Sequence, residues 1–150
     1  MNSRKHHKHS YKFKERAHGR VVDRIYQDPE LIKKEIGKFF YCEKETPIGP
    51  YLPDLTFLCE TETNGFYKVV LVECKTTEYG ISIRRGNQGL IRVMKKCLKE
   101  KGGLMKRYSQ IIRRNNLPEL KDLSFDYKFA VLNDFGGIEI INPLIWNNRR

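Results

Sequence analysis

The chain has 150 residues, of which 39% are hydrophobic, and its 29 Lys and Arg outnumber 18 Asp and Glu, giving a formal net charge of +11. This length suits a single domain with a real hydrophobic core. The chain lacks an apolar run of the roughly 20 residues that a transmembrane helix needs, and the basic N-terminus has no signal-peptide stretch. We therefore expect no membrane partner and an intracellular protein, either cytoplasmic, or in the nucleoid or a host cell if it is viral. The positive charge favours polyanions and predicts salt-dependent binding.

Composition divides the chain into a basic N-terminal arm, residues 1–18, and a single folded domain, residues 19–150. The arm is rich in Lys, Arg and His and has no apolar periodicity, which is typical of solvated chain that touches phosphates. The four cysteines, at positions 42, 59, 74 and 97, form no C-x-x-C pair. Reduced, partly buried thiols are therefore favoured over a zinc or iron–sulfur site.

The first predicted helix runs from about Pro29 to Ile36, with Asp28 as its N-cap and Gly37 as its end. Helical projection places Glu35 on the inward face of this helix. A strand is expected next, over residues 39–45.

Residues 53–75, PDLTFLCETETNGFYKVVLVECK, predict two strands joined by a tight turn. Both segments are apolar and β-prone, and Asn64-Gly65 between them suits the positive φ angles of a hairpin. In a hairpin the start of the first strand lies beside the end of the second. We therefore expect Asp54 and Glu73 to converge, with Lys75 on the same strand face as Glu73.

Two converging carboxylates beside an ammonium group suit a hard divalent cation, which prefers oxygen ligands. The lysine can orient or activate a water, or stabilise developing negative charge. This chemistry fits hydrolysis of a phosphodiester bond. A surface turn with a salt bridge at the strand end is the alternative interpretation.

Further along, apolar residues recur at helical spacing over residues 90–101 and again over 104–114, and Gly102-Gly103 is expected to separate two helices. Residues 115–125 are expected to be a connector. Two strands, 127–133 and 137–142, are then predicted to form a second hairpin.

Pro53-Asp54, followed after a gap by Glu73-Cys74-Lys75, resembles the PD-(D/E)XK nuclease superfamily. The resemblance implies an α/β domain with a restriction-endonuclease-like central mixed β-sheet flanked by helices. It implies that Asp54, Glu73 and the Cys74 backbone carbonyl bind Mg²⁺, for which Mn²⁺ would substitute, and that Lys75 assists the attacking water. An acidic residue on the first helix often joins such sites. Glu35 is our expectation for it, with Glu30 and His18 left open.

Residues 81–91, ISIRRGNQGLI, further resemble the segment after the Glu-x-Lys strand in archaeal Holliday junction resolvases. By that likeness a short basic strand leads to Gln88 at the start of a helix, where Gln88 helps to arrange the active site. By the same likeness Arg84 and Arg85 would contact phosphates. Lys95 and Lys96, on the charged face of the following helix, would also do so if that face lies near the cleft, and are otherwise solvated. A branched DNA substrate cut symmetrically would require a homodimer.

The expected function is thus Mg²⁺-dependent cleavage of nucleic acid, with DNA favoured over RNA and branched DNA favoured over linear. A non-cleaving nucleic-acid-binding protein on a nuclease fold remains the alternative from a different class. Within the nuclease class, a restriction-type or an RNA-cleaving enzyme remains open.

Overall fold

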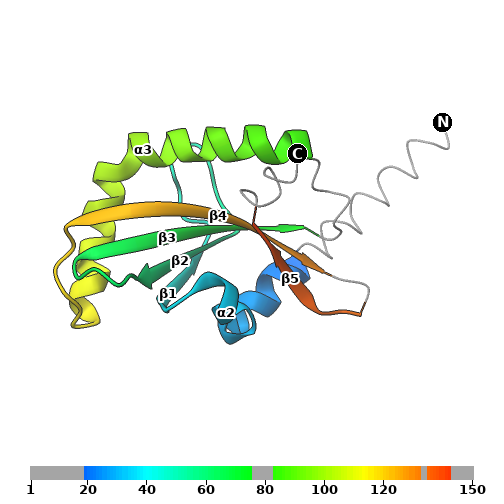
Figure 1. Cartoon of the computed structure of the whole chain (residues 1–150), viewed down its shortest axis with the longest axis horizontal. Helices are drawn as coiled ribbons and strands as arrows, with labels where there is room; N and C mark the ends of the chain where they lie inside the picture. Colours follow the sequence, from blue (N-terminus) through cyan, green and yellow to red (C-terminus); the bar gives the residue numbers. More distant parts are fainter. Residues whose placement is uncertain (1–18, 76–82, 133–134, 143–150) are drawn as a thin grey trace.

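The computed structural model describes residues 19–75, 83–132 and 135–142, with the backbone alone over 83–89 (Figure 1). Five strands form one mixed sheet in the order β1-β2-β3-β4-β5. They are β1 (Phe39–Lys44), β2 (Leu55–Glu60), β3 (Phe66–Lys75), β4 (Asp122–Leu132) and β5 (Ile138–Ile141). β3 and β4 are parallel, whereas the other neighbouring pairs are antiparallel. The expectation of an α/β fold with a central mixed sheet is confirmed.

The β2–β3 hairpin has the strands that the sequence predicts, because its turn suits no residue other than glycine. Gly65 has a φ of +86°, and a Cβ atom there would lie 2.9 Å from the carbonyl oxygen of Glu119. The ladder runs from Glu60 opposite Tyr67 to Leu55 opposite Val72. The residue before β2 therefore lies beside the last residues of β3.

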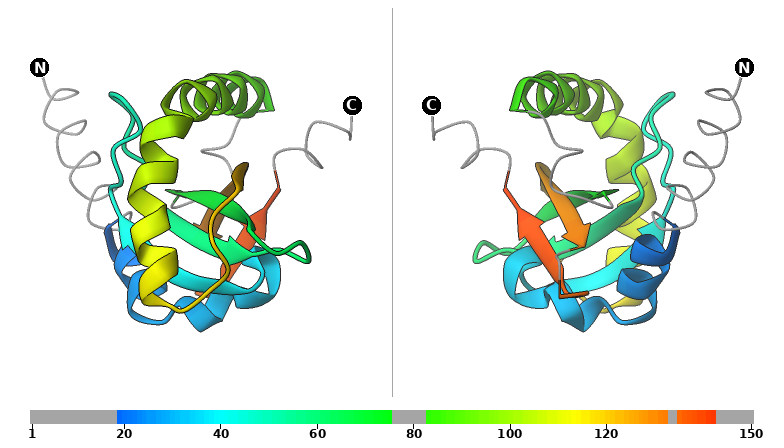
Figure 2. Two further views of the ribbon diagram at one scale, coloured as in Figure 1. Left: turned by 90° about the vertical axis from the view of Figure 1, so that its left-hand side faces the viewer. Right: turned by 90° about the vertical axis from the view of Figure 1, so that its right-hand side faces the viewer.

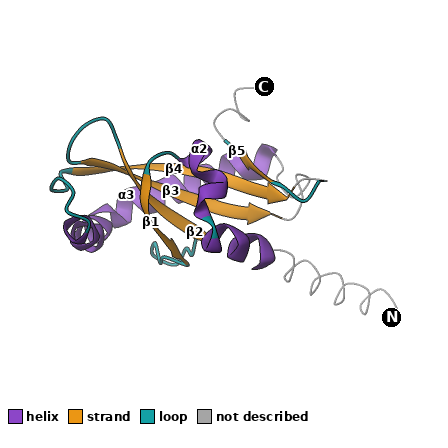
Figure 3. Ribbon diagram, turned by 90° about the horizontal axis from the view of Figure 1, so that it is seen from below, coloured by secondary structure: helices purple, strands orange, loops and turns teal. Residues whose placement is uncertain are grey.

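Helices cover both faces of the sheet, so that the fold has three layers (Figures 1 and 3). α3 (Ile83–Arg114) lies over one face, where alternate β3 side chains Tyr67, Val69 and Leu71 enter its core. The opposite core receives Val70, Val72 and Cys74. It is covered by the helix 19–27, by η1 (Pro29–Ile32) and by α2 (Lys33–Ile36). None of the helices in the described ranges has the length and hydropathy to span a membrane.

The prediction that Gly102-Gly103 ends a helix is wrong, since α3 is continuous through both glycines. The buried residues Cys97 and Leu104 are seven apart, two helical turns, so the apolar stripe keeps its phase across the pair. Both halves therefore pack on the same sheet. α3 bends partway along its length (Figures 1 and 2), and paired glycines favour such a bend. Helical spacing over residues 90–101 also predicts core contacts for Ile91 and Leu98, and this is wrong because both side chains are exposed.

The predicted helix ending at Gly37 is present, but its first turn is the 3₁₀ helix η1 rather than α-helix. The helix 19–27 precedes it and buries Val21 and Ile25. β4 begins at Asp122, within the segment expected to be a connector, because its first residues pair with the start of β3. The N-terminal arm lies outside the described residues.

A buried carboxylate ties α3 to the sheet. Glu43 of β1 accepts hydrogen bonds from Arg107 and Tyr108 of α3, at 2.7 and 3.0 Å. Tyr41 and Thr46 also donate to it, at 2.8 and 2.7 Å. Burial alone would raise the pKa of Glu43, but these four donors hold the pKa below its ordinary value.

Candidate metal centre

Asp54 and Glu73 meet at one end of the sheet, because Asp54 directly precedes the last rung of the β2–β3 ladder. Its Oδ2 accepts a hydrogen bond of 2.8 Å from the Cys74 backbone N–H. This bond holds the carboxylate against the end of β3. Burial, followed by the nearby Asp54 charge, raises the pKa of Glu73 to about 7. The predicted convergence of the two carboxylates is therefore present.

The Glu73 carboxylate has a tyrosine donor that the sequence did not reveal. The Tyr51 hydroxyl, from the loop before β2, donates a short hydrogen bond to Glu73 Oε1. It also contacts the hydroxyl of Tyr127 on β4. Burial and the adjacent Glu73 charge raise the pKa of both tyrosines. Both hydroxyls thus stay protonated and available as donors at neutral pH.

The position of Tyr51 follows from a tight turn in the loop. Ile48, which is fully buried, and Tyr51 exchange two backbone hydrogen bonds of 2.8 and 3.1 Å. Gly49 between them has a φ of +60°, a conformation that suits glycine. A Cβ atom on Gly49 would lie 3.4 Å from the Glu100 carboxylate of α3. The buried Ile48 side chain and the close approach of Glu100 to Gly49 therefore fix the loop that carries Tyr51.

Lys75 is the last residue of β3 and shares a strand face with Glu73, as predicted. Its positive charge acts on Glu73 and opposes the rise of the Glu73 pKa. The N–H and C=O of one residue in an antiparallel strand point to the same side. Because the Cys74 N–H points to Asp54, its carbonyl faces the same side and can join the two carboxylates as a neutral oxygen ligand.

A hollow of about 190 Å³ opens beside Asp54, between the helix 19–27 and the end of β1. The residues that line it are Gly19, Val22, Asp23, Lys44, Glu45 and Asp54. Asp23 is therefore the first-helix acid that shares a cavity with Asp54. Its Oδ1 lies 2.7 Å from Lys44 Nζ. The sequence prediction missed Asp23 because it started the helix at Pro29, although the Val21 and Ile25 periodicity extends the helix back.

The inward placement of Glu35 is wrong. Glu35 is exposed on α2, which leads directly into the start of β1. Phe39 at this start pairs with Cys59, at the end of β2 away from Asp54. Glu30 lies on the same segment and pairs with Lys33. Neither glutamate joins the carboxylate cluster, and His18 lies outside the described residues.

The predicted helix beginning at Gln88 is also wrong, because α3 starts at Ile83. Arg84 and Arg85 thus lie in its first turn rather than on a strand. The side chains of all three residues fall outside the described part of the chain. Lys95 is exposed, whereas Lys96 is partly buried with its Nζ 5.4 Å from the centre of the Tyr51 ring. Lys96 therefore packs on the tyrosine whose hydroxyl donates to Glu73.

The donor set fits a hard cation. Burial and, after it, the Asp54 charge raise the pKa of Glu73, and a divalent ion between the two carboxylates would favour their charged forms. The two carboxylate side chains alone are fewer ligands than a fully coordinated cation needs. In the described ranges no three or more His, Cys, Asp or Glu side chains gather as metal ligands. A cation here would complete its coordination with the Cys74 carbonyl, water and substrate oxygens, as Mg²⁺ often does.

Comparison with known proteins adds no relative, since no family model, curated protein or solved structure matches the chain.

Proposed function

We propose that this protein is a Mg²⁺-dependent endonuclease of the PD-(D/E)XK type that cleaves nucleic-acid phosphodiester bonds. The observation that carries the proposal is the contact between the Asp54 and Glu73 carboxylates, with Lys75 on the same strand end. A buried structural carboxylate is normally paired with donors, as Glu43 is. A pair of facing carboxylates is instead suited to hold a cation.

In this proposal Asp54, Glu73 and the Cys74 carbonyl hold Mg²⁺, which would stabilise charge on the phosphate and lower the pKa of a bound water. The Lys75 ammonium group orients the attacking water and stabilises the negative charge that develops on the phosphate oxygens. Tyr51 holds Glu73 Oε1 in place, leaving Oε2 for the ion. Asp23 lines the same hollow as Asp54, and its Lys44-paired carboxylate would add negative charge near a cation held there.

The basic surface supports a nucleic-acid substrate. The N-terminal half of α3 exposes Arg92, Lys95 and Lys99, and Lys96 lies over the Tyr51 ring. Such groups contact the phosphate backbone and position it without reading bases. The net charge of +11 adds long-range attraction that salt weakens. A homodimer and a preference for DNA over RNA remain predictions.

The test is a cleavage assay with a four-way junction, a flap, a linear duplex and a single-stranded RNA. We expect cleavage of at least one substrate in Mg²⁺ or Mn²⁺, none in EDTA, and none by Asp54→Ala. Binding of all four substrates without cleavage under any condition would favour the non-cleaving alternative. Cleavage of RNA alone would favour an RNA-cleaving enzyme over a junction-resolving one.

A further inference from the structure

The β4–β5 hairpin carries the most exposed large hydrophobic side chain among the described residues. Phe135 in its turn is 97% exposed, whereas the next most exposed, Leu98, is 67% exposed. Isolated apolar side chains on a surface are ordinary. A ring with almost its whole area in water is a stronger signal, because it gives up nearly all the free energy that burial would provide.

The hairpin lies at the same end of the sheet as the carboxylate cluster. β3 and β4 are parallel, and Lys75 pairs with Val131, one residue before the end of β4. Phe135 follows Val131 by four residues, and a chain extends at most about 3.6 Å per residue. Its backbone is therefore within roughly 15 Å of the strand position beside Lys75.

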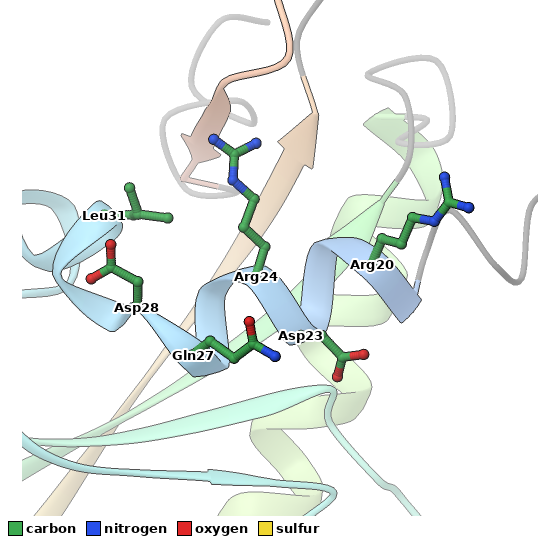
Figure 4. A pocket seen from close by; sticks show the side chains of 6 residues that line it. All are labelled: Arg20, Asp23, Arg24, Gln27, Asp28 and Leu31. Atoms are coloured by element: carbon green, nitrogen blue, oxygen red, sulfur yellow. The ribbon is translucent and has the colours of Figure 1, made fainter.

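One arginine contacts this turn, and a second lies one helical turn away from the first. Arg24, from the helix 19–27, donates a short hydrogen bond to the Gly136 carbonyl, which anchors the turn to the helix. Arg20 lies one helical turn earlier on the same face. Both guanidinium groups extend from the same side of the helix in Figure 4. They line a hollow of about 440 Å³ together with Asp23, Gln27, Asp28 and Leu31.

The hollow contains both acidic and basic side chains, but the charge of one of its two acids is balanced by a lysine. Asp23 is paired with Lys44 at 2.7 Å. The surroundings of Phe135 thus combine an exposed aromatic face with guanidinium groups, the combination that proteins use to bind unpaired nucleotides.

We infer that Phe135, with Arg20 and Arg24, forms a stacking platform for an unpaired nucleic-acid strand that leaves the carboxylate cluster. A base stacks on the Phe135 ring while the guanidinium groups contact the adjacent phosphates. This inference rests on the proposed nuclease function and narrows its substrate. It favours a flap, a junction or a single strand, since the stacked bases of a continuous duplex present no free face to the ring.

The test measures binding in EDTA, so that cleavage does not enter, by fluorescence anisotropy with labelled oligothymidylate and with a duplex of equal length. We expect Phe135→Ala to weaken oligothymidylate binding at least about fivefold and duplex binding less than twofold. Phe135→Trp should retain wild-type affinity. Arg20→Ala should weaken binding to both nucleic acids and reduce the slope of log affinity against log salt concentration by about 1.

Phe66→Ala is the matched control. Phe66 is 43% exposed and lies at the start of β3, the end of the sheet away from the carboxylates. Its removal should leave both affinities unchanged. An equal loss for single strand and duplex in Phe135→Ala, or no loss at all, would overturn the inference.

Membrane insertion is the competing use of an exposed aromatic tip, and sedimentation with phosphatidylserine–phosphatidylcholine vesicles tests it. Vesicle binding that depends on Phe135, with oligothymidylate binding unchanged in Phe135→Ala, would overturn the platform. Failure of the two proposals is distinguishable. A protein that never cleaves yet binds single strands through Phe135 loses only the nuclease assignment, and a nuclease indifferent to Phe135→Ala loses only the platform.

Discussion

Two glutamates on the α3 side of the sheet show how surroundings determine the role of a buried carboxylate. Glu43 accepts four hydrogen bonds, including one from the Arg107 guanidinium, and its pKa is lowered. Glu73 accepts one from Tyr51, faces the Asp54 carboxylate, and has a pKa raised to about 7. Glu43 is thus satisfied by the protein itself. The negative charge of Glu73 is instead disfavoured by burial and by Asp54, and a bound cation would stabilise it.

The largest expected effect is loss of cleavage, with nucleic-acid binding retained, in variants of Asp54, Glu73 and Lys75. Asp54→Ala and Glu73→Ala should abolish cleavage, and Lys75→Ala should lower its rate by about 10²–10³-fold, the usual cost of removing one group that stabilises transition-state charge. All three should largely retain nucleic-acid binding. Single-turnover cleavage and anisotropy measure the two properties. Lys68→Ala, on the opposite face of β3, is the control, and full activity in any of the three variants would remove that residue from the mechanism.

The next effect concerns stability at Glu43. Glu43→Gln removes the charge that pairs with Arg107 and misplaces donors around Tyr108 and Thr46, so it should destabilise the fold by about 2–4 kcal/mol. Urea unfolding measures this change. Glu139→Gln, at an exposed position on β5, should have almost no effect. A neutral Glu43→Gln would mean that the four hydrogen bonds do not hold α3 to the sheet.

The opposite sign is expected for Glu73→Gln in metal-free protein. Between pH 4.5 and about 7 the unfolded chain releases the Glu73 proton while the folded protein keeps it, so folded stability falls as pH rises through this window. Glu73→Gln removes this loss and should stabilise the protein at pH 8 by up to about 3 kcal/mol, with little effect at pH 4.5. Thermal unfolding in EDTA at both pH values measures it. Destabilisation at pH 8 would contradict the raised pKa of Glu73 and the unfavourable burial of its charge beside Asp54.

The smallest effect is expected at the hydroxyl that holds Glu73. Tyr51→Phe keeps the ring under Lys96 and removes one hydrogen bond to a charged group, worth about 1 kcal/mol or more. The Mg²⁺ concentration for half-maximal cleavage should rise about fivefold. Tyr67→Phe, whose hydroxyl donates to Pro118 at the far end of the sheet, is the control. An unchanged Mg²⁺ dependence in Tyr51→Phe would show that Tyr51 does not position Glu73.

Sequence patterns predicted most of the sheet and the core of the site, because both depend on local signals. Asn64-Gly65 specifies the turn, and the resulting hairpin register brings Asp54 beside Glu73. The contribution of Tyr51 was not predictable, since it depends on how the loop packs between the sheet and α3. The Glu35 expectation failed for two reasons. The segment begins as a 3₁₀ helix, so projection at α-helical spacing gave the wrong face, and α2 leads into the end of β1 that lies away from Asp54.

The continuous α3 was open to prediction, and its interpretation as two helices overweighted the glycine pair. The spacing of Cys97 and Leu104 keeps the apolar stripe in phase, which a loop between two helices would not require. Asp23 was within reach for a similar reason. The four-residue spacing of Val21 and Ile25 extends the predicted helix back over Asp23, an acid that shares a hollow with Asp54.

Titration with Mn²⁺ by isothermal calorimetry tests the central claim most directly, because it measures the cation site without depending on the substrate. We expect the wild-type protein to bind Mn²⁺, and Asp54→Asn and Glu73→Gln each to lose this binding, while Glu139→Gln keeps it. A wild-type protein that binds no Mn²⁺, or an Asp54→Asn variant that binds it as tightly as wild type, would contradict a metal centre formed by these two carboxylates.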